Sequence, residues 1–431
     1  MNTVYSFIFF VCLTTLGLSD SQAASTTHFS VMTFNIENGG TQVNFQKVVE
    51  AIKRSKADIV GIQEAWGNTK RLAKELGWQF YDPKQHIVSK FPLYDPRDHH
   101  GLYVLVEVQP NQFIAMANMH LPDEPYGPDL IKKGSSEPRV IANENRVRLP
   151  TALPYITQLR SLAHQGVPVF LTGDFNSPSN LDWTRSTVNV LRNHRYDVPW
   201  PVTKTLENNG FIDSYRSYHP DPIQSPGYTW PSGRPALEKS FDNFNPTAND
   251  FPDRLDFIFT SGPTKVMESE VVGESDPKTS KIHITPWPSD HRAVISQFEV
   301  TPHVFPKEFL TPIKVQRNLD KPTITAPKLV FKTGEIIPIH WTHAPGNGYD
   351  YIRIVPTHND PLHVYETAAR FYTHGAINGS VQYSSKNVDG NWTAWFKSSE
   401  SHWPLAPGNY DIQLMLDDGM TVLASTSIVV K

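Results

Sequence analysis

Short apolar runs that end in polar residues constrain the fold of this chain more than any other feature. Runs of this length between turn-forming residues are typical of β-strands. The chain also has 36 prolines and 24 glycines, which favour short strands joined by turns over long helices. The runs lie at 31–34, 59–62, 113–120, 167–172, 254–259 and 293–298.

Helical spacing interrupts this strand pattern in three places. Apolar residues recur every three or four positions over 44–56 and 148–163, and 69–76 reads as another short helix. Strands separated by short helices predict a mixed α/β domain, which we expect to span residues 24–305. At 431 residues the chain is too long for one typical domain, so a second domain is expected.

The amino-acid composition changes near residue 301, where prolines begin to recur. We interpret residues 306–328 as a linker. Residues 329–431 then show only strand-like runs. About six strands in a hundred residues are the signature of a small β-sandwich. The expected strands are 336–341, 351–355, 380–384, 393–396, 410–416 and 421–430.

Residues 1–23 resemble an export signal. The apolar run 6–18 is shorter than the roughly 18–20 residues that span a bilayer, and Ser21 and Ala23 suit cleavage after Ala23. The alternatives are a buried strand or a membrane anchor. Cys12, the only cysteine, lies in this segment, so a mature chain would have no disulfide and no thiol nucleophile. We expect a secreted or periplasmic monomer without a transmembrane segment.

The formal net charge of −4 gives no sign of a basic stripe. This disfavours a module that grips nucleic acid by charge alone. It leaves a nuclease open, because a bound metal ion can carry the local positive charge.

The polar residues at the run ends supply carboxylates, amides and two imidazoles. Oxygen ligands suit a hard divalent cation, and an imidazole can activate water, as hydrolysis of a phosphate ester requires. Each cluster alone could be a turn, a cap or a structural histidine. Their occurrence together at strand ends favours one shared site. The candidates are Asn35, Glu64, His120, Asp174, Asn176, Asp256, Asp290 and His291.

The sequence stretches that contain these candidate residues together resemble the endonuclease/exonuclease/phosphatase superfamily. That superfamily includes pancreatic-type deoxyribonuclease, abasic-site endonucleases, neutral sphingomyelinases and inositol polyphosphate 5-phosphatases. The resemblance covers about residues 28–300, in matching order. The matching stretches are Thr33-Phe34-Asn35-Ile36-Glu37, Ile59-Val60-Gly61-Ile62-Gln63-Glu64, Ser89-Lys90-Phe91-Pro92, Asn118-Met119-His120-Leu121, Thr172-Gly173-Asp174-Phe175-Asn176, Arg254-Leu255-Asp256-Phe257-Ile258 and Pro288-Ser289-Asp290-His291-Arg292.

The resemblance implies a four-layer α/β-sandwich, with two packed sheets flanked by helices, and a metal site. Glu64 would be the principal Mg²⁺ ligand, helped by Asn35 and Asp290, with Mn²⁺ or Ca²⁺ as alternatives. Glu37 would be either a further metal helper or an exposed strand residue.

The resemblance also implies roles in the hydrolysis itself. His291 would be the general base, oriented by Asp256. Asp174 and Asn176 would position water and phosphate. His120 would donate a hydrogen bond to the phosphoryl group or a proton to the leaving oxygen.

The substrate is less constrained than the chemistry. A nuclease could use Arg139, Arg146 and Arg148, although these could equally be solvated. A phospholipid headgroup hydrolase could use the aromatics of the loop 215–235, which could instead pack on one another. A soluble phosphate ester stays open, and so does a non-catalytic binding protein on the same fold. Residues 121–128 directly follow His120 and are expected to shape the pocket.

The carboxy-terminal region resembles immunoglobulin-like modules attached to secreted hydrolases. We expect this module to have a structural or docking role without chemistry of its own. The resemblance is carried by Phe331-Lys332-Thr333-Gly334-Glu335, Trp341, Ala344-Pro345-Gly346-Asn347, Tyr349-Asp350-Tyr351-Ile352 and Pro407-Gly408-Asn409-Tyr410.

Overall fold

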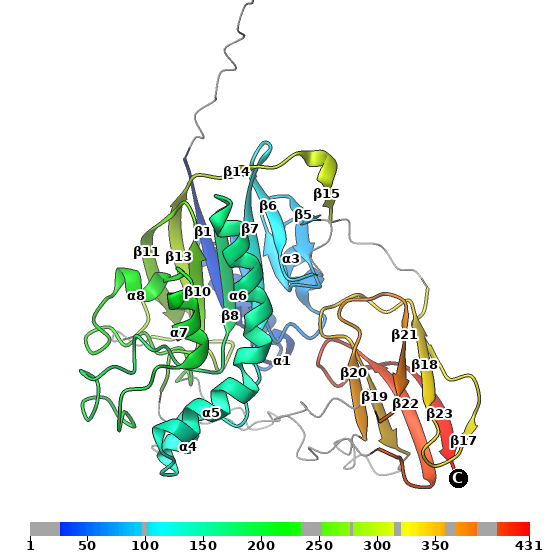
Figure 1. The fold of residues 1–431 in the computed structure, drawn as a ribbon. Helices are drawn as coiled ribbons and strands as arrows, with labels where there is room; N and C mark the ends of the chain where they lie inside the picture. The colour runs from blue at the N-terminus through cyan, green and yellow to red at the C-terminus, as the bar shows by residue number, and fades with distance from the viewer. Residues whose placement is uncertain are drawn as a thin grey trace, which may run out of the picture.

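The computed structural model describes residues 26–96, 101–233, 252–275, 279–313, 320–357, 368–385 and 403–431. A mixed α/β domain is followed by an all-β domain that lies against one side of it (Figure 1). The expected export signal 1–23 and the expected strand 393–396 fall outside the described residues. Within the described ranges, no helix has the length and apolar character needed to cross a membrane.

Two mixed sheets form the first domain. The first sheet has the order β12 (Ile282–His283), β11 (Thr264–Gly273), β13 (Ala293–Val300), β1 (Thr27–Asn35), β2 (Ile59–Gln63), β4 (Ile87–Ser89) and β3 (Phe80–Asp82). The second has the order β15 (Leu310–Pro312), β5 (Leu93–Pro96), β6 (Val104–Gln109), β7 (Gln112–His120), β8 (Val169–Asp174), β10 (Asp256–Ser261) and β9 (Ile212–Asp213), and β14 (His303–Val304) pairs with β7.

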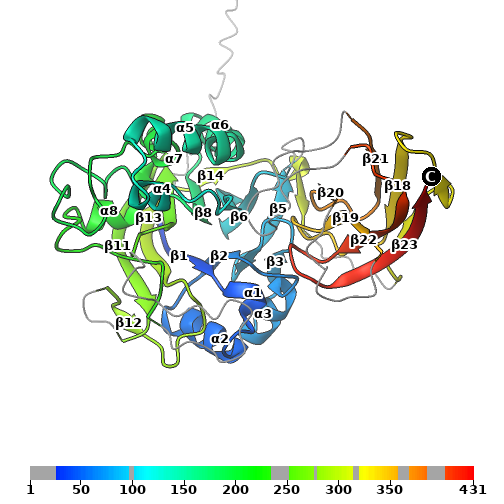
Figure 2. The same ribbon diagram turned by 90° about the horizontal axis from the view of Figure 1, so that it is seen from below.

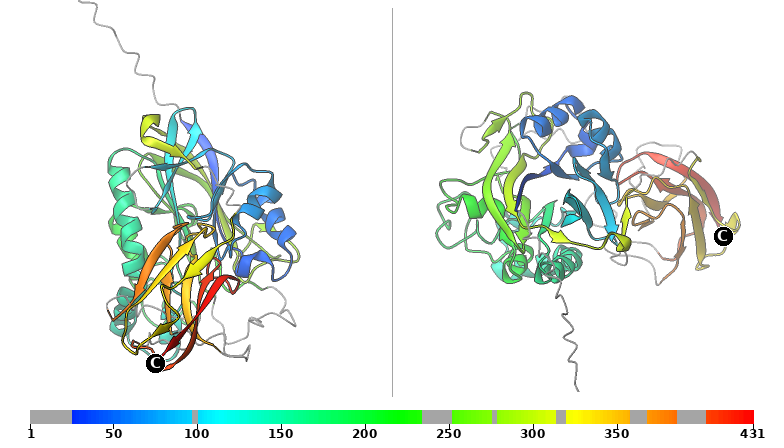
Figure 3. Two further views of the ribbon diagram at one scale, coloured as in Figure 1. Left: turned by 90° about the vertical axis from the view of Figure 1, so that its right-hand side faces the viewer. Right: turned by 90° about the horizontal axis from the view of Figure 1, so that it is seen from above.

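The two sheets pack face to face, and helices cover their outer faces (Figure 3, right). Val31 and Ile59 of the first sheet share a buried core with Val106 and Phe170 of the second. The helices α2 (Phe45–Arg54) and α3 (Thr69–Leu76) pack on the first sheet, and α6 (Leu149–His164) and α7 (Pro201–Asn208) on the second. The remaining helices are α1 (Glu37–Gly40), α4 (Gly127–Lys132), α5 (Glu137–Val147) and α8 (Ser214–Tyr218). Sheets flanked by helices agree with the expected α/β arrangement.

Local sequence signals account for the ends of the predicted helices. The Asn44 side chain accepts a hydrogen bond from the Gln46 backbone N–H and caps α2. Helix α3 ends at Gly77, whose φ of 77° belongs to the left-handed region that glycine adopts without steric cost. The expected helix 148–163 corresponds to α6, within one residue at each end.

Strand direction brings the expected site residues to one edge of the first domain. Strand β1 runs parallel to β2, and β7 runs parallel to β8, so their carboxyl ends lie side by side. These ends carry Asn35, Glu64, His120 and Asp174. Strand β10 runs antiparallel to β8 and begins with Asp256 directly opposite Asp174.

The second domain has a core between two sheets. One sheet has the order β16 (Thr323–Thr325), β18 (Ile337–Thr342) and β21 (Gly379–Tyr383). The other has the order β17 (Val330–Phe331), β23 (Val422–Val430), β22 (Gly408–Met415), β19 (Tyr351–Pro356) and β20 (Ala369–Tyr372).

The segment 306–328, expected to be a linker, contributes strands at both of its ends. Strand β15 follows the 3-10 turn Lys307–Phe309 and extends the second sheet of the first domain by pairing with β5. Strand β16 pairs with β18 in the second domain. The second domain lies beside β3 and β5 of the first (Figure 2), where the Gly348 N–H donates to the Pro83 carbonyl at 3.2 Å.

Candidate active site

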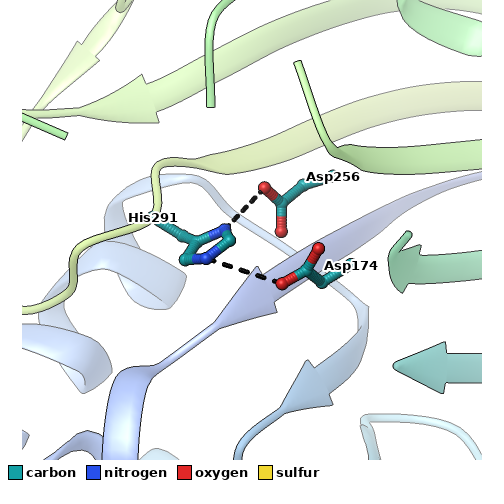
Figure 4. Close-up of side chains that lie close together, drawn as sticks. All are labelled: Asp174, Asp256 and His291. Atoms are coloured by element: carbon teal, nitrogen blue, oxygen red, sulfur yellow. Dashed lines mark hydrogen bonds and ion pairs between the residues drawn. The ribbon is translucent and has the colours of Figure 1, made fainter. Parts of the chain in front are cut away.

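The strongest feature of the site is a buried histidine between two aspartates (Figure 4). His291 Nδ1 lies 2.9 Å from Asp256 Oδ2. On the other side of the ring, His291 Nε2 lies 3.5 Å from Asp174 Oδ2, longer than a typical hydrogen bond. Burial disfavours a charged ring, but the carboxylates of Asp256, Asp174 and Asp290 outweigh burial and raise the pKa of His291 well above its usual range.

The segment around His291 is tied to the neighbouring strands. The Ser289 hydroxyl donates to the Asn35 carbonyl at 2.6 Å and accepts from the His291 N–H at 3.1 Å. The Trp287 indole N–H donates to the His291 carbonyl at 2.6 Å. The imidazole therefore sits on a backbone that is held on both sides.

A second group of side chains surrounds Glu64, at the end of β2. Asn35 donates from Nδ2 to Glu64 Oε1 and to Asp174 Oδ2, both at 3.0 Å. The Asn38 N–H donates to Glu64 Oε2 at 2.9 Å. Asn35 Oδ1 accepts from the Glu37 N–H at 3.0 Å, and this bond sets the orientation of the amide. In this orientation Asn35 holds the Glu64 carboxylate in place.

Asp290 joins the same group through Glu37. The Asp290 N–H donates to Glu37 Oε2 at 3.0 Å, and Glu37 is buried. Of the two alternatives for Glu37, the structure therefore contradicts the exposed strand residue. Burial and the nearby charge of Asp290 raise the pKa of Glu64.

The carboxylates around Glu64 fit a hard divalent cation. Asp290 Oδ1 is buried and has no hydrogen-bond partner among the described residues. Buried polar atoms are nearly always paired, and neighbouring carboxylates repel each other unless a cation lies among them. A ligand atom from each of Asp174, Asp256 and His291 also lies within 4.8 Å of the others, close enough to hold a metal ion in principle.

His120 ends β7 on the far side of Asp174. Its Nε2 lies 3.2 Å from Asn176 Nδ2 and 3.5 Å from Asp174 Oδ2. Asn176 has a left-handed φ of 48°, and its N–H donates to Asp174 Oδ1 at 2.9 Å. The turn after β8 thus directs the Asn176 amide toward His120. All eight candidate residues lie in this one connected region.

A buried polar layer beneath the site supports these positions. Gln63 donates from Nε2 to Asn118 Oδ1 at 2.7 Å, and Thr172 donates to the same atom at 2.9 Å. This layer joins β2 of one sheet to β7 and β8 of the other. A Cβ on Gly61 would lie 2.0 Å from Thr172 Oγ1, so only glycine permits this approach. Gln63 and Asn118 stood inside the matched stretches, but only the structure shows their contacts.

Several residues considered for substrate binding have other positions. Arg148 is fully buried and pairs with Glu144 at 2.6 Å, so it neither lines a groove nor faces solvent. In the loop 215–235, described up to residue 233, Tyr215 is buried. Trp230 packs edge-to-face on Tyr126 at 5.8 Å, with its ring centroid 6.5 Å from that of His291. Tyr126, in the segment 121–128, is therefore separated from His291 by the Trp230 ring.

The fold and the site define a protein with an acidic, histidine-containing centre at the strand ends of two packed sheets. A profile of the Endonuclease/Exonuclease/phosphatase family matches residues 32–291, more than half of the chain. This chain belongs to that family, whose members are hydrolases that act on phosphate esters.

The chain is also similar to individual proteins. An uncharacterized protein of Caenorhabditis elegans is 30% identical over 316 residues, which cover 68% of this chain and 98% of that protein. Among solved structures, an AP endonuclease from Archaeoglobus fulgidus is 16% identical, with a TM-score of 0.39, over 62% of this chain and 98% of that one. A family protein from Bacteroides thetaiotaomicron is 14% identical, with a TM-score of 0.38, over 64% of this chain and 96% of that one.

Proposed function

We propose that this protein is an exported, Mg²⁺-dependent phosphoesterase that hydrolyses phosphate esters, phosphodiesters in particular, with His291 as the general base. The observation that carries the proposal is the buried His291–Asp256 contact at 2.9 Å. Next to it lies the Glu64 carboxylate, whose pKa is raised by burial and by the nearby charge of Asp290. An activated water and a cation among oxygen ligands are the two requirements of metal-assisted ester hydrolysis.

The contact with Asp256 assigns the proton positions on His291. The neutral ring is favoured once a bound cation would offset the carboxylate charge that raises the pKa of His291. A carboxylate accepts a hydrogen bond, so in that ring Nδ1 carries the proton and Nε2 has the free lone pair. Nε2 then takes a proton from the attacking water, and Asp256 stabilises the imidazolium that forms. Asp174, 3.5 Å from Nε2, is placed to accept a hydrogen bond from that water.

Glu64 and Asp290 would hold the cation, with Mn²⁺ or Ca²⁺ as alternatives to Mg²⁺. Asn35 orients Glu64 through its amide, and direct ligation by its oxygen would require the amide to turn over. When bound, the cation lowers the pKa of a coordinated water and offsets charge on the phosphoryl oxygens.

His120 and Asn176 are placed to bind the phosphoryl group. Charge grows on its non-bridging oxygens as water attacks, so fixed donors stabilise the transition state more than the ground state. Asn176 is held by the turn after β8, which keeps its amide beside His120.

Hydrolysis of bis-p-nitrophenyl phosphate with Mg²⁺, and its loss with EDTA, tests the proposal. His291→Ala should lower kcat by about 10²–10⁴-fold, the usual contribution of a positioned acid or base. His164→Ala, at an exposed helix end, is the matched control. If the folded wild-type protein cleaves no phosphate ester with any divalent ion, the chain is instead a non-catalytic binding protein.

The substrate class stays open between nucleic acid, a phospholipid headgroup and a soluble phosphate ester. The Tyr126–Trp230 pair beside His291 suits an ester with a flat or apolar group next to the phosphate. Parallel assays on DNA, RNA, sphingomyelin and inositol phosphates decide between them.

Export by residues 1–23 and an immunoglobulin-like second domain also belong to the proposal. The two-sheet core of the second domain supports the latter. Amino-terminal sequencing of protein recovered outside the cell should begin at Ala24, and a start at Met1 would contradict cleavage.

A further inference from the structure

We propose that the second domain is a structural part of the active site. In this proposal Asp417 positions the loop that carries Glu64, and Tyr349 positions the strand end that carries His120. The inference rests on the proposed function and adds two positioning residues to it. Neither residue touches the reacting atoms.

Asp417 contacts both sides of the Glu64 loop. Its Oδ2 accepts a hydrogen bond from the Gly67 N–H at 2.5 Å, three residues after Glu64. Its Oδ1 lies 2.8 Å from His86 Nε2, and both side chains are buried. The His86 carbonyl in turn accepts from the Ile62 N–H at 2.9 Å, two residues before Glu64.

The electrostatics of this contact favour a charged pair. Burial disfavours protonated His86, but the carboxylates of Asp417, Asp82 and Asp418 outweigh burial and raise the pKa of His86. A buried carboxylate is stable only when it is paired and hydrogen-bonded. Asp417 accepts a hydrogen bond from the Gly67 N–H and forms an ion pair with His86, although Oδ1 and Nε2 are not aligned as a hydrogen bond. The two domains are therefore joined where Glu64 is held.

The Glu64 loop has a conformation that needs such support. Glu64 and Trp66 have left-handed φ values of 54° and 43°, which are uncommon for residues other than glycine. Strained backbone of this kind persists only where the surroundings hold it in place. A Cβ on Gly67 would lie 2.8 Å from Leu416 Cδ2, so the second domain packs directly on this backbone.

Tyr349 makes the second connection, on the other side of the site. Burial raises the pKa of Tyr349 well above its usual range, and the backbone N–H of His120, next to the Tyr349 hydroxyl, counters this rise in part. The Tyr349 ring packs on His86 at 5.3 Å and edge-to-face on Tyr372 at 5.9 Å. The Tyr372 hydroxyl donates to Asp418 at 2.8 Å, so the aromatic pair is anchored within the second domain.

These two contacts predict separable effects. Loss of Asp417 loosens the segment that presents Glu64 and so weakens cation binding. Loss of the Tyr349 hydroxyl loosens the end of β7 and so weakens phosphate binding by His120. General separation of the domains would alter both properties in every variant.

The test uses the full-length chain with Asp417→Ala, Asp417→Asn and Tyr349→Phe. The control is Asp411→Asn, because Asp411 lies in the second domain and accepts a hydrogen bond at 2.7 Å from the exposed Ser427 hydroxyl. Three quantities are measured: Mn²⁺ affinity by calorimetry, hydrogen exchange of the 64–68 amides, and KM for bis-p-nitrophenyl phosphate at saturating Mg²⁺. The first two need no catalysis.

We expect Asp417→Ala to weaken Mn²⁺ binding about tenfold, the lower end of the roughly 10–100-fold effect of groups that orient metal ligands. It should also speed exchange over 64–68. Asp417→Asn keeps one acceptor and should restore part of both. Tyr349→Phe should raise KM several-fold and leave Mn²⁺ affinity as in the wild type, whereas Asp411→Asn should change none of the three.

If Asp417→Ala keeps the Mn²⁺ affinity of the wild type and the same hydrogen exchange over 64–68, the proposed role of Asp417 is overturned. Equal loss of Mn²⁺ affinity in Asp417→Ala and Tyr349→Phe would overturn the division of roles, because it would show general undocking. A wild-type chain that binds Mn²⁺ but hydrolyses no ester would refute the proposed function alone. Calorimetry and exchange would then still decide whether Asp417 positions Glu64.

Discussion

Replacing Asp256 with Asn should lower kcat while leaving the fold and Mg²⁺ dependence intact. Asp256 is fully buried, and its Oδ2 lies 2.9 Å from His291 Nδ1. Asn has almost the same shape and can keep a neutral hydrogen bond through its amide oxygen. The substitution therefore removes mainly the negative charge that stabilises the imidazolium after proton transfer.

The size of the effect follows from this geometry. Two unit charges at about 4 Å interact by about 4 kcal/mol at an effective dielectric constant of about 20. A neutral hydrogen bond retained by Asn offsets about 1 kcal/mol of this loss. The remaining ~3 kcal/mol, at about 1.4 kcal/mol per factor of ten, corresponds to a fall in kcat of roughly 10²-fold.

The assay is steady-state hydrolysis of bis-p-nitrophenyl phosphate at saturating Mg²⁺. Asp197→Asn, at an exposed position, is the matched control and should retain wild-type kcat. Thermal unfolding of each variant shows whether the fold is kept. A folded Asp256→Asn protein with kcat within about threefold of wild type, a loss below 1 kcal/mol, would refute the assignment of Asp256 as the partner of the base.

Three further substitutions test the metal ligand, a buried histidine and a close backbone approach. Glu64→Gln should raise the Mg²⁺ concentration for half-maximal activity at least tenfold, and an unchanged titration would reject Glu64 as a ligand. Burial lowers the pKa of His194 to about 4. Between this pH and the ordinary histidine pKa of ~6.5, the folded state therefore binds fewer protons than the unfolded state. The contribution of His194 to stability is complete above pH ~6.5 and is lost as the pH falls through about 4. In His194→Gln, the free energy of unfolding measured with urea should therefore fall by about 2–3 kcal/mol less between pH 7 and pH 4.5 than it does in the wild type. The same pH dependence in both proteins would contradict the lowered pKa of His194. Gly61→Ala should destabilise the first domain by at least about 2 kcal/mol, because the new Cβ would clash with Thr172. Gly77→Ala has open space around the new Cβ and should cost only about 1 kcal/mol of strain from its left-handed φ. A larger loss of stability in Gly77→Ala than in Gly61→Ala would contradict the packing argument.

Much of the first domain was predictable because its signals are local. The helix α3 matches the predicted 69–76, and the polar residues at the run ends do lie at one edge of the sheets. Asn35 and Asp174 are the last residues of β1 and β8, and Glu64 directly follows β2, so strand direction alone brings them together. Hydrophobic periodicity, helix caps and turn residues predict where strands and helices end without any knowledge of tertiary contacts.

The environment of each side chain was less accessible from the sequence. Arg148 stood in a polar stretch that suits solvent or a groove, yet it is buried against Glu144. Only the packing of α5 and α6 decides between these outcomes. Glu37 was balanced between two roles for the same reason, because its contact with the Asp290 N–H joins positions 253 residues apart.

The role of the second domain was the least accessible from the sequence. Asp417 belongs to a turn whose residues fit any exposed loop, and its partner Gly67 lies 350 residues away. The sequence predicted a module with a structural or docking role and no chemistry of its own. The Asp417 contact nevertheless ends on the loop of a proposed metal ligand. Removing residues 329–431 takes away Asp417 and Tyr349 together, so activity on small esters should persist, but only at raised Mg²⁺ and with a raised KM. Deletion that left the Mg²⁺ response unchanged would show that the Glu64 loop keeps its left-handed conformation unaided.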